Sequence, residues 1–256
     1  MIKLFRNIRK KLLAEGKTSK YFKYAIGEIF LVVIGILIAL QINDWNEHRK
    51  NQTLEKRYIA ELRSDLQKDS IAIQDMIKTS NLQVRSKALL FMFLEKHSDY
   101  KIAEDLKPMV KNIIYNEQMV SDSIATHFNK QWQPTYNFAP NKTTLDEMTS
   151  TGNIGLISNR ELRRAVLETY NQYERHKLRQ ESMYRKQQEE MWNLVYAEVP
   201  NMYSVKSSDL PQIFEDHEVI NRFEGNYAIF MNDGLYDLQT TNQHLLDQLN
   251  EYQKEN

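Results

Sequence analysis

The longest apolar stretch of the chain lies near its N-terminus, at residues 24–43. No charged residue occurs from Ile29 to Asn43, and Glu28 is the single acid just before them. A hydrocarbon core about 30 Å thick is crossed by roughly 20 largely apolar helical residues. The pattern therefore predicts a retained transmembrane helix over residues 24–43. A cleaved signal peptide, with a shorter apolar region and a small-x-small exit site, is the competing interpretation.

Beyond this stretch, apolar residues recur three and four positions apart. These positions are Ile59, Leu62, Leu66, Ile73 and Met76, with Asp69 at the one position that breaks the seam. The spacing predicts a single helix that continues from Asp44 to about Leu94. A connection is expected over residues 98–107, and Pro108 suits the first turn of the next helix. That helix is expected to carry Val110, Ile113, Ile114 and Tyr115.

The second half of the chain carries further helix signals. Capping-box patterns at Thr144–Glu147 and Ser158–Glu161 predict a short helix that stops at Gly152 and a long one without a breaker until Pro200. A final seam has one polar residue inside it, and its members are Leu235, Leu238, Asn242, Leu245, Leu249 and Tyr252. A buried Asn within such a seam fixes the register of packing at some cost in stability.

Composition supports an all-α fold. The 256 residues include only 7 Gly and 5 Pro, which suits long helices rather than a sheet with many turns. There is no Cys, so disulfides, thiolate nucleophiles and zinc–thiolate sites are excluded. We therefore expect an N-terminal transmembrane helix that continues into a long helix, packed in an antiparallel helical bundle outside the membrane.

Charge gives this arrangement an orientation. Eight cations and one acid precede the apolar stretch, against four cations in the next fifteen residues. The positive-inside rule then predicts a cytoplasmic basic amphipathic segment at 1–23, a transmembrane helix at 24–43 and a periplasmic helical-bundle domain at 44–256, in a bacterial inner membrane. Residues 43–256 hold 26 cations and 32 acids, so nucleic acid is not expected as a partner.

Two blocks of the chain carry a resemblance to a known family. They run from Tyr21 to Glu47, with Gly35-Ile-Leu-Ile-Ala-Leu-Gln-Ile-Asn43 at the centre, and from Thr143 to Ser158. They resemble a large family of single-pass bacterial membrane proteins classed as a domain of unknown function. The resemblance implies an inner-membrane anchor with a helical outer domain. It implies no activity, so no catalytic residue follows from it.

The search for chemistry finds no catalytic constellation. The six His residues make no metal-ligand spacing, and we expect no metal, no cofactor and no enzymatic activity. An aromatic stretch between Phe128 and Pro140 is the best candidate for a partner contact, through Trp132, Tyr136 and Phe138. Packing of these rings in the core is the alternative interpretation.

Small residues recur on one face of the predicted transmembrane helix. Gly27, Gly35 and Ala39 share that face, and small-x-x-x-small pairs let two helices approach closely. Glu28 lies beside them and either pairs with a partner helix or serves the headgroups, Lys20 or Lys23. The expected function is a non-enzymatic interaction or scaffold module whose partners are the lipid bilayer and a second copy or another protein. A ligand-sensing domain that relays through a partner membrane protein is the alternative.

Overall fold

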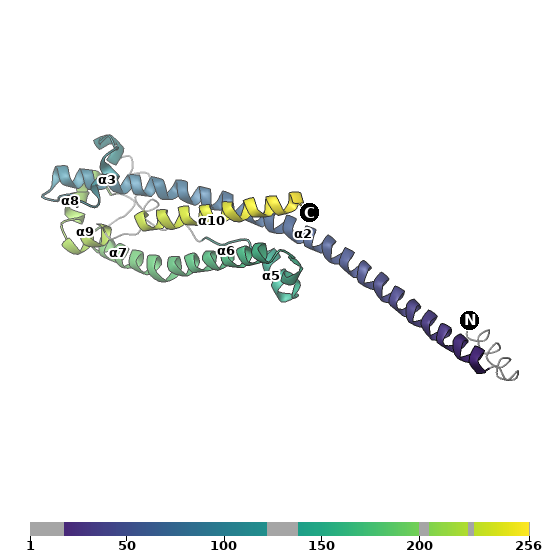
Figure 1. The fold of residues 1–256 in the computed structure, drawn as a ribbon. Coiled ribbons are helices and arrows are strands. Elements are labelled where there is room, and N and C mark those ends of the chain that lie inside the picture. Colours follow the sequence, from purple (N-terminus) through teal and green to yellow (C-terminus); the bar gives the residue numbers. More distant parts are fainter. Residues whose placement is uncertain (1–17, 122–137, 200–204, 225–227, 256) are drawn as a thin grey trace. The chain divides into compact units, whose positions relative to one another are not determined.

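The computed structural model describes residues 18–121, 138–199, 205–224 and 228–255 (Figure 1). The chain divides into two compact units, Met1–Arg57 and Tyr58–Asn256. Helix α2, Thr18–His97, contributes residues to both units. The predicted continuous helix is confirmed, and it ends three residues beyond Leu94.

In the first unit, α2 carries the apolar stretch found in the sequence. Its most apolar window has a mean hydropathy of 2.5, and none of that window is buried within the protein. Among the described residues this is the one helix long and apolar enough to cross a membrane. The membrane boundaries at residues 24 and 43 stay predictions, as does the assignment of residues 1–23 and 44–256 to the cytoplasm and periplasm.

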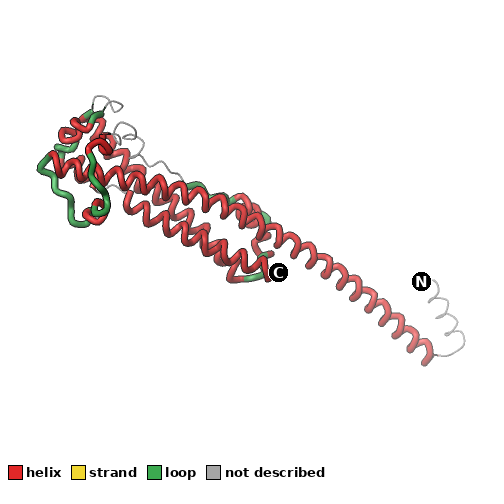
Figure 2. The backbone as a smooth tube through the Cα atoms, turned by 90° about the horizontal axis from the view of Figure 1, so that it is seen from above, coloured by secondary structure: helices red, strands yellow, loops and turns green. Residues whose placement is uncertain are grey.

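The second unit is built mainly from three long rods of helix, drawn as red tubes in Figure 2. The first is the part of α2 from Tyr58 onward. The second is α6, Arg160–Arg179, continued by α7, Arg185–Glu198, and the third is α10, Ala228–Glu255. Every described element is a helix, a turn or a loop, so the all-α fold is confirmed.

Side-chain pairs give the directions of these rods. Arg63 of α2 donates to Gln253, and Asn81 donates to Tyr236 at 3.4 Å, so α10 runs antiparallel to α2. Thr241 donates to Gln172 at 2.8 Å, whereas Gly234 faces His176, so α10 is also antiparallel to α6. Helices α2 and α6 therefore run in the same direction, which requires the chain between them to return to the first end of the bundle.

Short elements close the bundle. They are α3 (Lys107–Val110), α5 (Thr143–Ser150), the 3₁₀ turns η1 (Asn153–Leu156) and η4 (Ser207–Asp209), α8 (Leu210–Ile213) and α9 (His217–Glu224). A large apolar core joins α8 and α9 to the C-terminal end of α2 and to α7. Its most buried rings are Phe91, Trp192, Phe214 and Phe223.

Several predicted helix ends are corrected. The helix at Pro108 ends already at Val110. Helix α5 does end before Gly152, whose φ of 74° is left-handed, but its first residue is Thr143 and no side chain of its own caps it. The capping box at Thr144–Glu147 is therefore wrong. At α6 the N-cap is Asn159 rather than Ser158, because its side chain accepts the backbone N–H groups of Glu161 and Leu162.

One feature of the long rod has no sequence signal. A single π-helical turn, η2 (Gln180–Tyr184), joins α6 to α7. Such turns add a residue to the helix and often accompany functional positions. Here the side chain of Gln180 is buried and its Oε1 accepts the backbone N–H of Phe138 at 3.2 Å. The π-helical turn therefore begins at the residue that binds the backbone of Phe138.

Candidate functional site

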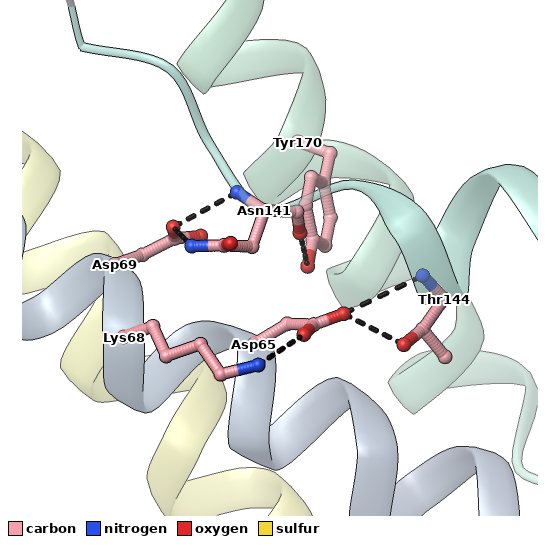
Figure 3. Close-up of polar contacts among 6 residues, drawn as sticks. All are labelled: Asp65, Lys68, Asp69, Asn141, Thr144 and Tyr170. Atoms are coloured by element: carbon pink, nitrogen blue, oxygen red, sulfur yellow. Dashed lines mark hydrogen bonds and ion pairs between the residues drawn. The ribbon is translucent and has the colours of Figure 1, made fainter.

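Two buried carboxylates on α2 face the start of α5 (Figure 3). Asp65 and Asp69 are four residues apart, so they lie one helical turn apart on one side of α2. Opposite them the chain runs from Asn141 to Thr144, where α5 begins. We call this arrangement the carboxylate clamp, and it consists of Asp65, Asp69, Asn141, Thr144 and Tyr170.

Asp69 holds Asn141 by two hydrogen bonds. Its Oδ1 accepts the backbone N–H of Asn141 at 2.9 Å and the side-chain amide of the same residue at 2.6 Å. From α6, the Tyr170 hydroxyl donates to the carbonyl of Asn141 at 3.1 Å. The backbone N–H and the side chain of Asn141 are thus bound by α2, and its backbone carbonyl is bound by α6.

Asp69 is fully buried, and burial is the main reason why its pKa is raised above the ordinary value. The nearby Asp65 raises the pKa further, whereas the two N–H groups of Asn141 lower it. Burial also raises the pKa of the Tyr170 hydroxyl, so that group stays protonated and able to donate. Burial thus keeps the Tyr170 hydroxyl a donor, while the two N–H groups of Asn141 favour the ionised, accepting form of Asp69.

Asp65 supplies the cap that α5 lacks. Its Oδ2 accepts the Thr144 hydroxyl at 2.6 Å and the Thr144 backbone N–H at 3.4 Å, while Lys68 lies 3.4 Å from its Oδ1. The first N–H groups of a helix have no partner inside the helix, and negative charge there is favourable. A carboxylate from another helix therefore does the work of a local capping residue.

A further pair ties the other end of α5 to α2. The Tyr58 hydroxyl donates to Glu147 Oε1 at 2.8 Å and accepts from the Asn153 side chain at 3.0 Å. Tyr58 is itself 1% exposed. The segment Asn141–Asn153 is thus fastened to α2 over roughly three turns, by polar contacts at each end and by buried Leu145 and Met148 between them.

The single Asn of the C-terminal seam lies in the same layer. Asn242 is 1% exposed, and its amide donates to the Leu66 carbonyl at 3.0 Å and to the Tyr173 hydroxyl at 2.7 Å. One side chain of α10 therefore contacts α2 and α6 together. The predicted burial of Asn242 inside the seam is confirmed, and its partners fix which residues of the three rods lie at one level.

One turn further along α6, His176 packs against α10. A Cβ atom at Gly234 would lie 3.2 Å from His176 Cε1 and 3.3 Å from its Nδ1, so the absence of a side chain permits the approach. Burial, with a contribution from Arg179, lowers the pKa of His176 to about 4. The imidazole is therefore neutral at pH 7 and serves as a packing group.

The far end of the bundle holds a buried cation. Lys87 is 2% exposed, with its Nζ 5.0 Å from the ring centroid of Phe223 and 5.9 Å from that of Phe91. Burial lowers its pKa to about 7, and Glu224 opposes that shift. Glu224 also accepts the Tyr100 hydroxyl at 2.7 Å. This group fastens α9 to α2 much as the clamp fastens α5.

These arrangements position backbone rather than reacting groups. Asp69 Oδ1 and Asp65 Oδ2 accept N–H and O–H groups of the chain itself, whereas Asp69 Oδ2 is buried without a hydrogen-bond partner. In the part of the chain that the structure describes, no three His, Asp or Glu residues come together as a metal site. The geometry thus defines a helical module with internally fastened ends.

The residues expected to contact partners have different outcomes. Trp132 and Tyr136 lie outside the described residues. Phe138 is 1% exposed and its ring meets that of Tyr173 at 5.1 Å in an edge-on contact. The expectation of a partner contact is therefore corrected for Phe138, for which core packing is observed.

The membrane-helix residues all lie on α2. Gly27, Gly35 and Ala39 are exposed, Glu28 is partly exposed, and an added Cβ at either glycine meets no atom within 4 Å. This openness leaves room for another helix, but contact with one stays a prediction.

Sequence reasoning missed the clamp although one signal was present. Asp69 interrupts an apolar seam, which marks a polar group that must find partners when buried. Its partner Asn141 lies 72 residues away, and no local spacing connects the two. Lys87 gave no comparable signal, because a Lys on a long polar helix is ordinarily exposed.

Taken together, these features define an all-α protein with a fastened bundle and one exposed apolar helix. The chain belongs to a family of unknown function (DUF6090), whose model matches residues 28–223. That range includes the block Thr143–Ser158 and most of the first block, so the resemblance to a family of unknown function is confirmed, while the single-pass membrane character of that family stays a prediction. No curated protein and no solved structure matches the chain.

Proposed function

We propose that this protein is a single-pass anchored protein of the bacterial inner membrane whose bundle serves as a non-enzymatic interaction or scaffold module. The observation that carries the proposal is the apolar window of α2. Its mean hydropathy is 2.5 and none of it is buried within the protein. Each large apolar side chain removed from water contributes about 1.5–3 kcal/mol. A lipid bilayer supplies that burial where the fold does not.

Charge supports the orientation within this proposal. The eight cations before the apolar stretch favour a cytoplasmic N-terminus, which places the bundle in the periplasm. The absence of Cys is compatible with either compartment, since it removes any dependence on redox conditions. A reporter that folds only in the periplasm, fused after Asn256, tests this. Activity supports the orientation, and an inactive reporter on a membrane-bound fusion refutes it.

The internal fastening of the bundle supports an interaction role over catalysis. The described polar clusters join helix ends by hydrogen bonds, as between Asp65 and Thr144 and between Tyr100 and Glu224. Rigid helical surfaces of this kind suit recognition, because little conformational freedom is lost on binding. The partner is a second copy of the chain or another protein of the same membrane.

Self-association through the small-residue face is directly testable. Gly35 and Ala39 are exposed on α2 and let two helices approach closely. Gly35→Leu together with Ala39→Leu adds bulk on that face, whereas Val33→Leu together with Leu37→Phe adds bulk on the opposite side. Cross-linking in intact membranes should recover a dimer from the wild type and the control pair, but not from the first pair. Equal yields from both pairs would refute association through this face. Recovery of free monomer alone would refute self-association and leave only a protein partner.

A further inference from the structure

The stretch of α2 that follows the apolar window separates its charges by side. An α-helix turns about 100° per residue, so residues of like charge between 44 and 57 fall into two sectors. The cations Arg49, Lys50, Lys56 and Arg57 share one side, and the acids Asp44, Glu47 and Glu55 share the other. The side of α2 that carries the cations is therefore strongly positive, even though the stretch as a whole is nearly balanced.

An open groove lies on the positive side. It is lined by Arg49, Lys50, Thr53, Leu54 and Arg57. Three of these five side chains are cations, whereas the Thr53 hydroxyl donates to the Arg49 carbonyl of its own helix at 2.9 Å. Guanidinium and ammonium groups form a donor set for phosphate, and Arg is suited to bind two oxygens of one phosphate. The open groove is thus positively charged and carries donors that suit an anion.

The groove lies a short distance beyond the predicted end of the membrane span. At 1.5 Å per residue, Arg49 is about 9 Å and Thr53 about 15 Å past Asn43. Helix side chains lean toward the N-terminus, which here is the side of the span. Arg49 shows this lean, because its guanidinium carbon lies 5.4 Å from the ring centroid of Trp45, one turn nearer the span. Trp favours the interface between lipid and water.

We propose that this groove binds the phosphate of an anionic phospholipid headgroup, in the leaflet on the same side of the membrane as the bundle. The inference rests on the proposed membrane anchor, which would hold the groove at the surface where lipid phosphates are concentrated. Long cationic side chains near the ends of membrane helices reach back to headgroups in this way. Lipid phosphates then fix the depth of α2 in the bilayer by binding Arg49 and Lys50. Arg57 lies further from the span along α2 and attracts the same headgroups at longer range.

Full-length protein in nanodiscs provides the test. Discs of phosphatidylcholine containing phosphatidylglycerol are opened in detergent, and native mass spectrometry counts the anionic lipids that stay bound. The groove variant is Arg49→Gln, Lys50→Gln and Arg57→Gln. The control removes the same charge from exposed positions of the bundle, by Lys78→Gln, Lys101→Gln and Lys111→Gln. A parallel titration with inorganic phosphate asks whether a soluble anion displaces the lipid.

The wild type and the control should retain phosphatidylglycerol in preference to phosphatidylcholine. The groove variant should lose that preference, with affinity reduced about a hundredfold for three lost cations. Equal retention by both variants, or no preference in the wild type, would overturn the proposal. Displacement by millimolar phosphate would also overturn it, in favour of a soluble anion. Alkaline carbonate extraction of membranes from bacteria that express the full chain distinguishes failure of the membrane anchor from failure of the lipid site. If the protein is extracted, the anchor and the lipid site both fail. If it stays in the membrane without lipid preference, only the lipid site fails.

Discussion

The backbone N–H of Asn141 donates to the buried carboxylate of Asp69 at 2.9 Å, across 72 residues of sequence. The side-chain amide of Asn141 binds the same oxygen at 2.6 Å. One carboxylate oxygen on α2 therefore sets where the chain enters α5, and the family-typical block Thr143–Ser158 follows directly from this point. The stability of the bundle should depend on this contact more than on any exposed ion pair.

Replacing Asp69 by Ala leaves the half-buried Asn141 donors without an acceptor, and should lower the free energy of unfolding by about 2–4 kcal/mol. Asp69→Asn keeps one acceptor oxygen and removes a buried charge, so its loss should be smaller. Urea unfolding of the detergent-solubilised full chain, followed by circular dichroism, measures both. Asp75→Ala, which removes an exposed ion pair with Lys78, should change stability by less than about 0.5 kcal/mol. An Asp69→Ala variant as stable as the Asp75→Ala control would contradict the clamp.

Asn242 offers a test of register. Asn242→Ala removes donors to the Leu66 carbonyl and the Tyr173 hydroxyl and leaves a cavity, so a loss of about 2–4 kcal/mol is expected. Asn242→Leu fills the space with an apolar group and should cost less, but it should broaden the amide spectrum because the three rods lose their common level. Nuclear magnetic resonance of isotope-labelled protein shows the difference. Thr240→Ala, at an exposed position of the same helix, is the control, and a sharp single spectrum for Asn242→Leu would count against a register role.

The outcome at these residues shows what local pattern can and cannot predict. Periodicity predicted α2, α6 and α10 because long seams of apolar residues determine long helices. The burial of Asn242 was predicted for the same reason, since its place in the seam is a local fact. The partners of Asp65 and Asp69 were not predicted, because Thr144 matches a local capping pattern equally well. The local pattern assigned Glu147 as the partner of Thr144 at the start of α5. In the structure that partner is Asp65, a carboxylate from α2.

Lys87 predicts a specific dependence of stability on pH. The unfolded chain keeps its proton up to the ordinary pKa of 10.5, whereas the folded protein releases it at about 7. The unfolded state therefore binds more protons between these values, and the free energy of unfolding should rise as the pH increases from 7 toward 10.5. The slope contributed by one such group is at most about 1.4 kcal/mol per pH unit.

Lys87→Met should remove this rise, as measured by urea unfolding at pH 7, 8 and 9. Lys78→Met, which alters an exposed Lys of the same helix, should leave the pH dependence of the wild type unchanged. Glu224, which acts on this ammonium group, and Tyr100, which donates to Glu224, remain in both proteins, so the difference between wild type and Lys87→Met isolates Lys87. Parallel curves for these two proteins would show that the buried cation does not titrate in this range.

The approach of α10 to His176 requires Gly at position 234. Ala in a helix interior is ordinarily favoured over Gly by about 1 kcal/mol. At Gly234, however, the added Cβ would lie 3.2 Å from His176 Cε1, and that ring is held by Phe138 on another side. Gly234→Ala should therefore lower the melting temperature by a few degrees. Gly155→Ala, where an added Cβ meets nothing within 4 Å, should leave it unchanged. A higher melting temperature for Gly234→Ala would mean that the ring yields.

Alkaline carbonate extraction of membranes from bacteria that express the full chain bears most directly on the role assigned to α2. Carbonate releases proteins that adhere to the surface and retains those that cross the bilayer. The exposed window of mean hydropathy 2.5 predicts that the protein stays in the pellet, and that replacing Ile34 and Leu37 by Lys shifts it toward the supernatant. Complete release of the wild-type protein would contradict the membrane anchor.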